Sequence, residues 1–355
     1  FSRKLRELME ERLQAGEQTI LFLNRRGYAG FISCRACGHV MKCPHCDVSL
    51  SEHRNGMLLC HYCGYEEPKR VLCPECGSRY LMGFKAGTEQ IEEALHREFP
   101  HARVLRMDAD TTRTKESYEK ILSAFADERA DILVGTQMIV KGHDFPNVTL
   151  AGILAADLSL NQNDYRAGER TFQLLTQAAG RAGRGDKPGE VVIQTYQPDH
   201  YSVIHAARQD YCSFYEEEIA YRDFLGYPPV AHMLAVLIIS REQDQGEKLG
   251  EEMADLVNRI GRSNCGNGNC DTGTGSGAHG TDKEQNGAHD GGLQVIGPAE
   301  ATISRINDLY RHVFYVKHSD YQRLVEVKDR LEAFCKEREM KNQTVQFDFD
   351  PINTY

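Results

Sequence analysis

Long apolar runs are missing from this sequence of 355 residues. No stretch of about 18 apolar residues occurs, which argues against a membrane span. A secretion signal is also missing, because residues 1–4 lead directly into a helix-like repeat without an apolar core and cleavage site. The first residue is not Met, so we expect a fragment of a longer protein. We expect that protein to reside in the cytoplasm.

Two signatures of nucleotide binding are absent as well. No G-x-x-x-x-G-K-[ST] phosphate loop occurs in the sequence. The segment most similar to this motif, at 83–88, lacks its Gly-Lys-Ser/Thr ending. There is no D-E-x-H box that would hold Mg²⁺. We therefore expect that this chain alone does not hydrolyse ATP.

Positive charge is scarce, with a formal net charge of -10 at pH 7. This balance argues weakly against a nucleic-acid partner, because phosphate contacts need Lys and Arg. Distribution matters more than the total. Segment 24–54, which includes Arg25 and Arg26, has more basic than acidic residues. Both a local basic face and a scattering of solvated charges fit this pattern.

Cysteine is abundant and clustered, since the chain has 12 Cys and most of them lie between positions 34 and 76. A C-x-x-C turn places two thiolates on one side of a tight knuckle, and two knuckles complete a tetrahedral zinc shell. Disulfides and iron–sulfur clusters suit this regular spacing less well. The sequence predicts two structural zinc ions. Their ligands form four pairs: Cys34/Cys37, Cys43/Cys46, Cys60/Cys63 and Cys73/Cys76.

The spacing also indicates how the pairs combine. The two inner pairs are separated as in a zinc ribbon and are expected to hold one ion, and the outer pairs the other. An interleaved arrangement, first with third and second with fourth, fits too. Glycine follows the second Cys of three pairs and suits a left-handed turn there. The nearby histidines are expected at the surface or facing DNA: His39, His45, His53 and His61.

Helical and strand patterns alternate around this cluster. Such alternation predicts an α/β fold with a parallel, doubly wound sheet. The expected strands are 19–23, 102–107, 131–135, 148–155 and 191–195, and the expected helices 3–15, 88–99, 115–127 and 167–181.

A second pattern, β-α-β-β-α-β, occupies the C-terminal third and predicts a small α+β domain. Its expected strands are 233–239, 295–299, 314–317 and 345–351, and its expected helices 245–260 and 320–336. The polar segment 263–292 is expected to be a disordered loop. Arg305, Arg311 and Lys317 are candidate DNA contacts.

Two loops of the parallel sheet carry candidate chemistry. The first, 135–145, follows a strand directly. The second, 177–185, ends a helix and places Arg181 and Arg184 three residues apart, on one expected helix face. Arginine suits bidentate contact with phosphate and stabilises charge on a transferring phosphoryl group.

These loops resemble known helicase motifs. GTQMIVKGHDFPNV resembles motif V of superfamily 2 helicases, and QAAGRAGRG resembles motif VI. Their order, the cysteine insertion after ILFLNRRGY and the segment DYRAGERTFQLLTQAAGRAGR together resemble the PriA family of replication-restart helicases. The resemblance covers roughly 1–240 closely and 290–355 more loosely.

The resemblance implies a fold and domain limits. We expect a RecA-like helicase lobe at 1–33 and 78–222, an inserted two-zinc module at 34–77, and a C-terminal α+β domain at 223–355. It also implies roles. Arg184 would be the γ-phosphate finger, helped by Arg181 and Gln177. Gly142 and Asp144 would face the nucleotide, and Thr136 and Gln137, together with the basic Arg25 and Arg26, would face DNA.

As function, the resemblance implies the C-terminal part of an ATP-dependent 3′–5′ DNA helicase that restarts stalled replication forks and assembles the primosome. ATP and Mg²⁺ would bind the complete enzyme. Expected partners are forked and single-stranded DNA, single-stranded DNA-binding protein and other primosome proteins, in the bacterial cytoplasm at the nucleoid. The alternatives are a zinc-stabilised DNA-binding or primosome-assembly module without motor activity, and a translocase that does not separate strands.

Overall fold

The computed structural model describes residues 1–23, 32–34, 36–37, 39–46, 48–52, 57–60, 62–83, 87–108, 111–112, 114–136, 139, 144–160, 164–264, 292–338, 340, 342–353 and 355. They pack into two compact units. The first comprises Phe1–Met41, Ser49–Leu59 and Glu66–Glu218, and the second comprises Lys42–Val48, Cys60–Tyr65 and Ile219–Tyr355. Among these residues, no helix has both the length and the apolar character that crossing a membrane requires.

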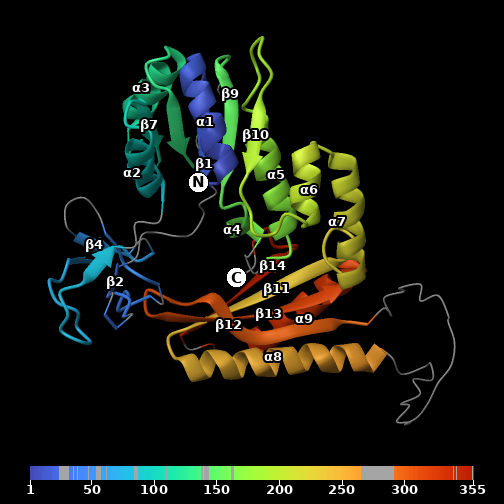
Figure 1. Cartoon of the computed structure of the whole chain (residues 1–355). Coiled ribbons are helices and arrows are strands. Elements are labelled where there is room, and N and C mark those ends of the chain that lie inside the picture. The colour runs from blue at the N-terminus through green and yellow to red at the C-terminus, as the bar shows by residue number, and fades with distance from the viewer. Residues whose placement is uncertain are drawn as a thin grey trace, which may run out of the picture. The chain divides into compact units, whose positions relative to one another are not determined.

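A five-stranded parallel sheet forms the centre of the first unit (Figure 1). Every pair of neighbouring strands runs parallel, which confirms the predicted sheet. Its strands, in spatial order, are β10 (Glu190–Ile193), β9 (Val148–Leu154), β1 (Gln18–Leu23), β8 (Ile132–Gly135) and β7 (Val104–Met107).

Helices cover both faces of this sheet, and strand β1 shows why. Leu21 and Leu23 pack on one side, while Ile20 and Phe22 pack on the other. A strand that is buried on both faces reads as a continuous apolar run. The first face is covered by α1 (Arg3–Ala15) and α2 (Thr88–Glu98), and the second by α3 (Lys115–Ala126), α5 (Ala167–Ala179) and α6 (Tyr201–Arg208).

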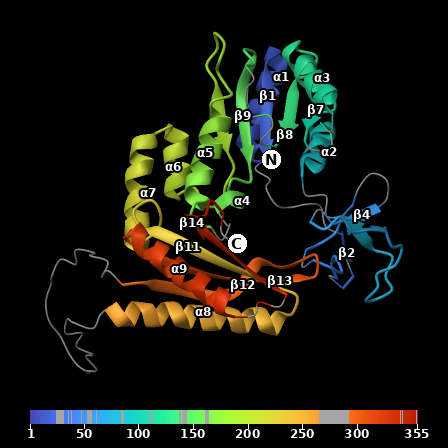
Figure 2. The same cartoon turned by 180° about the vertical axis from the view of Figure 1, so that it is seen from behind.

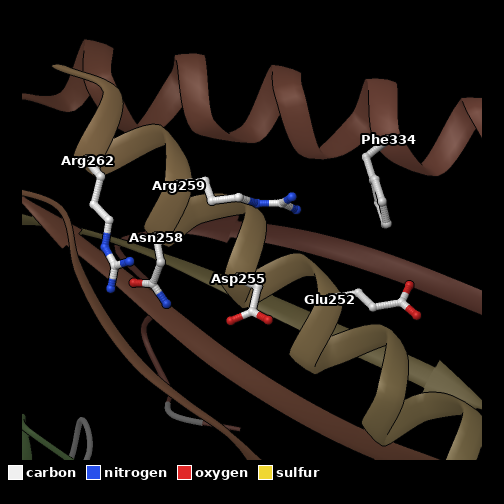
Figure 3. Close-up of a pocket in the computed structure, with 6 residues that line it drawn as sticks. All are labelled: Glu252, Asp255, Asn258, Arg259, Arg262 and Phe334. Carbon is white, nitrogen blue, oxygen red and sulfur yellow. The ribbon is translucent and has the colours of Figure 1, made fainter. Parts of the chain in front are cut away.

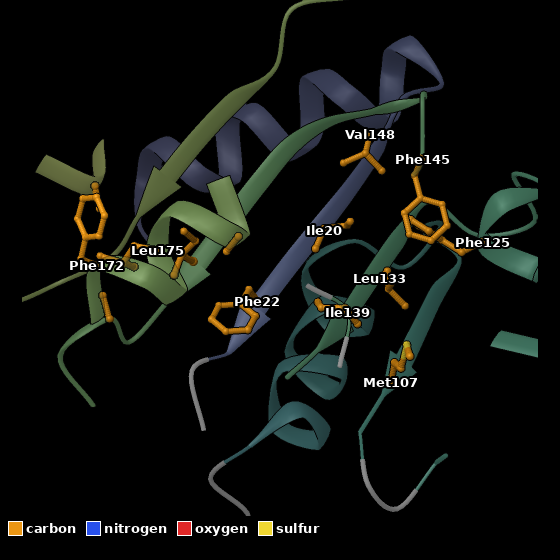
Figure 4. Close-up of a cluster of buried hydrophobic side chains, with 14 of the residues drawn as sticks. Ile20, Phe22, Met107, Phe125, Leu133, Ile139, Phe145, Val148, Phe172 and Leu175 are labelled. Atoms are coloured by element: carbon orange, nitrogen blue, oxygen red, sulfur yellow. The ribbon is translucent and has the colours of Figure 1, made fainter. Parts of the chain in front are cut away.

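Aromatic pairs anchor the second face (Figure 4). The rings of Phe125 and Phe145 meet edge to face, with centroids 4.9 Å apart. Phe172 stacks at 4.1 Å on Phe214 of α7 (Tyr211–Leu225). Such contacts fix the loop around Phe145 and the helix α5, which carry the two candidate motifs. The short α4 (Asp157–Leu160) precedes α5.

Small antiparallel sheets hold the cysteine-rich segments. Strands β2 (Ile32–Cys34) and β6 (Leu81–Gly83) pair so that Cys34 lies opposite Leu81. A three-stranded sheet follows the order β3 (Ser51–Glu52), β4 (Met57–Leu59) and β5 (Glu66–Pro68).

The C-terminal domain has the predicted β-α-β-β-α-β order. Its sheet is antiparallel, with the order β12–β13–β11–β14, and both helices cover one face of it (Figure 2). This arrangement is a split βαβ fold. The elements are β11 (His232–Ser240), α8 (Gln243–Asn264), β12 (Gln294–Ile306), β13 (Leu309–His318), α9 (Tyr321–Glu337) and β14 (Gln343–Phe349).

A polar hollow of about 540 Å³ lies between α8 and α9 (Figure 3). Charges of both signs line it, so it has no single-sign field that would select an anion or a cation. Its lining residues are Glu252, Asp255, Asn258, Arg259, Arg262 and Phe334.

Three expectations differ from the structure or extend beyond it. Helix α5 ends at Ala179, earlier than predicted, so the expectation that Arg181 and Arg184 share a helix face is wrong. Gly180 is the C-cap of this helix, and Gly183, four residues beyond Ala179, adopts a left-handed φ of 75°. Most of the predicted loop 263–292 lies outside the described residues, although α8 extends to Asn264. The predicted domain limits remain predictions.

Candidate metal centres and phosphate-facing loops

The four C-x-x-C segments share one backbone pattern. In each, the amide of the first Cys donates to the carbonyl five residues later, as Cys34 does to His39 at 2.8 Å. Cys43 donates in the same way to Val48, Cys60 to Tyr65 and Cys73 to Ser78. Gly64 and Gly77 adopt left-handed φ values of 77° and 68°, as the sequence predicts. The repeated sequence spacing therefore produces a repeated knuckle.

The knuckles bring eight sulfur atoms into two sets. Within each set, the sulfurs lie within 4.8 Å of one another. The inner pairs form one set and the outer pairs form the other, so the predicted grouping is confirmed and the interleaved one is wrong. The sets are Cys43, Cys46, Cys60 and Cys63, and Cys34, Cys37, Cys73 and Cys76.

Sulfur spacing fits a tetrahedral zinc ion. Cys34 and Cys76 sulfurs are 3.6 Å apart, and Cys37 and Cys73 sulfurs 3.7 Å. A tetrahedron with Zn–S bonds of about 2.3 Å has edges of about 3.8 Å. These cysteines are free thiols rather than disulfides. Hydrogen bonding from the Cys37 amide lowers the pKa of the Cys34 thiol to about 6. In the same set, hydrogen bonding from the His39 amide is outweighed by the Cys76 sulfur and burial, which raise the pKa of Cys37 to about 12.

Thr136 stands at the carboxyl edge of the parallel sheet, directly after β8. Its amide lies 3.4 Å from the carbonyl of Met107, where β7 ends. At the same edge, the Thr88 hydroxyl donates to Asp108 at 2.5 Å. Sequence reasoning missed Thr88 and Asp108, although polar residues that follow parallel strands mark a ligand-facing edge.

Arg106 belongs to this edge and was also missed. Its side chain is only 9% exposed, and its Nε lies 3.4 Å from carboxylates of both Glu92 and Asp108. An arginine so enclosed by acidic groups fixes the carboxyl edge rather than serving as a mobile surface cation.

Asp144 and Arg184 meet at the opposite edge, near the start of β9. Asp144 Oδ1 is 3.4 Å from Arg184 Nη1. Arg184 Nε also donates to the carbonyl of Gly180 at 2.8 Å. Burial, then the charge of Arg184, lowers the pKa of Arg181, while Asp144 opposes that shift. The structure thus brings three predicted phosphate-facing residues into one cluster.

Close backbone packing holds this cluster in place. The amide of Gly183 donates to the carbonyl of Val148 at 2.9 Å. A Cβ on Gly185 would lie 2.4 Å from the carbonyl oxygen of Pro146, so only glycine fits there. Segments 144–148 and 180–185 are therefore packed together directly. Gln177 is exposed on the last turn of α5.

The remaining sequence-predicted residues divide into two groups. Arg25, Arg26, Gln137 and Gly142 lie outside the described residues, as do His53 and His61. In the C-terminal domain, Lys317 is only 5% exposed, so its expected role as a DNA contact is wrong. Its ammonium lies 3.5 Å from the ring centroid of Tyr227 and donates to Leu225 O at 3.0 Å.

Family models match three parts of the chain. A model described as the PriA DNA helicase Cys-rich region matches 43–68, and the helicase conserved C-terminal domain matches 75–186. The primosomal protein N C-terminal domain matches 224–352. Each match coincides with a part of the structure described above.

Curated relatives match almost the whole chain. The replication restart protein PriA of Bacillus subtilis is 44% identical over 353 residues, which cover 99% of this chain and 40% of that protein. The protein of the same name from Synechocystis sp. is 38% identical, with coverages of 99% and 39%. That of Chlamydia trachomatis is 37% identical, with coverages of 100% and 44%. The chain spans about two fifths of the length of these relatives, and by sequence it belongs to the PriA family.

Proposed function

We propose that this chain is the C-terminal part of an ATP-dependent 3′–5′ DNA helicase that restarts stalled replication forks. The clustering of Arg181, Arg184 and Asp144 at one sheet edge supports this function best. Two guanidinium groups that lie together can contact a transferring phosphoryl group, and an adjacent carboxylate orients one of them.

We assign different chemistry to the two edges of the sheet, which are the edge where the parallel strands end and the edge where they begin. Register through β1 places Gly135 level with Ile153, five residues beyond Val148 along β9. Because strands rise about 3.3 Å per residue, the Thr136 and Asp144 edges are separated by about 16 Å. We assign the Thr136 edge, with Gln137, to the DNA backbone and the Asp144 edge, with Gly142, to the nucleotide.

One chain segment connects these edges. It follows β8 at Thr136 and leads through Asp144 into β9, and between these two residues Ile139 is completely buried in the core. Ile139 also donates its amide to the Thr136 carbonyl at 3.1 Å. In our proposal, this buried residue links the nucleotide-facing and DNA-facing edges of the sheet.

The sequence carries no phosphate loop, so the cluster needs a second lobe to form a complete site. ATP and Mg²⁺ would bind between that lobe and this chain, and Gln177, Arg181 and Arg184 would contact the phosphates. Alone, the chain would not hydrolyse ATP.

We assign structural zinc to both sulfur sets, because closed four-cysteine shells leave no open coordination position. Arg25 and Arg26 would bind DNA phosphates. Forked and single-stranded DNA, single-stranded DNA-binding protein and other primosome proteins would be the partners, at the bacterial nucleoid.

DNA-stimulated ATP turnover of the full-length protein that contains this chain tests the proposal. Arg184→Ala is expected to lower turnover about a hundredfold or more, which is the scale of arginine fingers, while DNA binding is retained. Arg129→Ala is the matched control, because Arg129 is 73% exposed and pairs with Asp127. Equal loss in both variants, or none in either, would refute the assignment of Arg184.

A zinc-stabilised DNA-binding or primosome-assembly module without motor activity is the second candidate. One observation favours it: Arg184 is engaged within its own chain, by Gly180 and Asp144. Strand displacement on forked DNA by the full-length protein separates the two. ATP-dependent displacement supports the helicase, whereas DNA binding without displacement or ATP turnover supports the module.

A further inference from the structure

The tip of the β12–β13 hairpin is a tight two-residue turn. Ile306 pairs with Leu309, and Asn307 and Asp308 connect them. Both turn residues have positive φ, at 51° and 57°. A two-residue turn of this kind is type I′, and it presents its backbone amides outward in a fixed direction.

Those amides contact a cysteine knuckle within the same compact unit. The amide of Asn307 lies 3.2 Å from the Cys46 sulfur. The amide of Asp308 donates to the His45 carbonyl at 2.9 Å. The Asp308 carboxylate also lies 2.7 Å from Nδ1 of His45. Three contacts therefore join the hairpin tip to residues 45–46, more than 260 positions away in sequence.

An amide aimed at a metal-bound thiolate has a specific effect. It disperses negative charge on the sulfur and fixes the orientation of the ligand, as outer-shell hydrogen bonds do at metal sites. The other sulfur set is arranged differently. There, His39 lies 4.0 Å from Glu75, a residue between two ligands of that same set.

We propose that the Asn307–Asp308 hairpin tip completes the Cys43/Cys46/Cys60/Cys63 metal site and fastens the C-terminal domain to it. Metal occupancy and hairpin docking then stabilise each other, because coupling between two equilibria is reciprocal. This inference rests on the proposed binding of zinc by that sulfur set. The other sulfur set is independent of the hairpin and serves as an internal reference.

Zinc release into a chelator tests one direction of this coupling. Asp308→Gly removes the carboxylate but leaves Asn-Gly, the preferred type I′ sequence, so the hairpin should still form. One zinc equivalent should leave about two- to fivefold faster, the scale of an exposed charged pair, and the other at an unchanged rate. His45→Ala should give the same result, with no further increase in the double variant. Asp329→Ala, on α9, is the control.

Hydrogen exchange tests the reverse direction without altering the hairpin. Cys60→Ser removes a ligand of the inner set and should speed amide exchange at residues 303–311 about tenfold or more. Cys73→Ser removes a ligand of the outer set and should leave that exchange unchanged. Fewer than two zinc ions on the unaltered protein would refute the zinc assignment, and this inference with it. Two zinc ions, with equal exchange in both variants, would refute the coupling alone.

Discussion

Asp144 and Arg184 face each other across a 3.4 Å contact although forty positions separate them in sequence. The pair joins the segment after β8 to the turn after α5. The Arg184 guanidinium also donates to the carbonyl of Gly180, the residue that caps α5. The position of the arginine therefore depends on both motif segments, and each can be tested by itself.

Loss of the Asp144 carboxylate should affect catalysis more than stability. The two side chains are 65% and 37% exposed, so Asp144→Asn should change the free energy of unfolding by less than about 1 kcal/mol. If Asp144 positions Arg184, kcat of the full-length protein should fall roughly tenfold to a hundredfold. Urea unfolding and ATP turnover, measured on the same preparations, check both. A kcat that stays unchanged contradicts a positioning role.

Two glycines provide a matched test of the turn that carries Arg184. Gly16 and Gly183 both have left-handed φ, at 68° and 75°. A Cβ on Gly16 meets nothing within 4 Å, whereas one on Gly183 would lie 2.5 Å from the amide nitrogen of Gly189. Gly16→Ala should cost about 1 kcal/mol of stability. Gly183→Ala should cost about 1–3 kcal/mol more through overpacking and should also reduce ATP turnover.

Comparable losses of stability, with turnover retained in the Gly183→Ala protein, would show that this turn does not position the arginines. Thermal unfolding together with turnover is sufficient to distinguish these outcomes.

Zinc content should change by whole equivalents. Cys60→Ser and Cys73→Ser should each lower bound zinc from two ions per chain to one, because they belong to different sulfur sets. The double variant should bind none. Cys212→Ser is the control, since this exposed cysteine of α7 belongs to neither set. Elemental analysis after gel filtration checks the count, and loss of both ions in either single variant would contradict independent sites.

The buried amine of Lys317 should make stability depend on pH. Burial lowers the pKa of Lys317 to about 8, from an ordinary value of 10.5. Between these values the unfolded chain binds more protons than the folded chain, so the free energy of unfolding should rise with pH, by at most about 1.4 kcal/mol per unit. Burial also raises the pKa of the adjacent Tyr227, so its hydroxyl stays neutral through this window.

Lys317→Met should remove that rise. Urea unfolding at several pH values between about 8 and 9.5 measures the difference between the two proteins. Parallel slopes in the parent and the variant would show that another group titrates there.

Local pattern was sufficient to predict much of this fold. The apolar run at 19–23 indicated a buried strand, and Gly64 and Gly77 marked left-handed turns because no other residue adopts them as easily. The repeated C-x-x-C spacing favoured two sulfur sets, and the ribbon-like separation of the two inner pairs favoured the inner and outer grouping. The strand and the turns lie within a few residues of the signals that predict them, whereas the grouping joins cysteines up to 42 positions apart.

Other features that depend on distant partners, and that no repeated motif marks, were not predicted. In the sequence, Lys317 resembles an ordinary exposed cation in a strand. It is buried because it contacts Leu225 and Tyr227, about ninety positions earlier. His45 reads as a free surface ring until the hairpin turn at Asp308 is placed beside it. Strand order in the parallel sheet is equally non-local. Strand β1 pairs with β8 and β9 rather than with β7, which is the next strand of this sheet along the chain.

The long sequence separation between His45 and Asp308 also orders events during synthesis. A ribosome releases Cys43, Cys46, Cys60 and Cys63 well before Asn307, so the inner sulfur set can gather before the hairpin is translated. The Asn307 amide follows only when the C-terminal domain emerges, and contacts so distant in sequence form late in folding. A nascent chain therefore holds the inner knuckles without the Asn307 donor until the hairpin emerges.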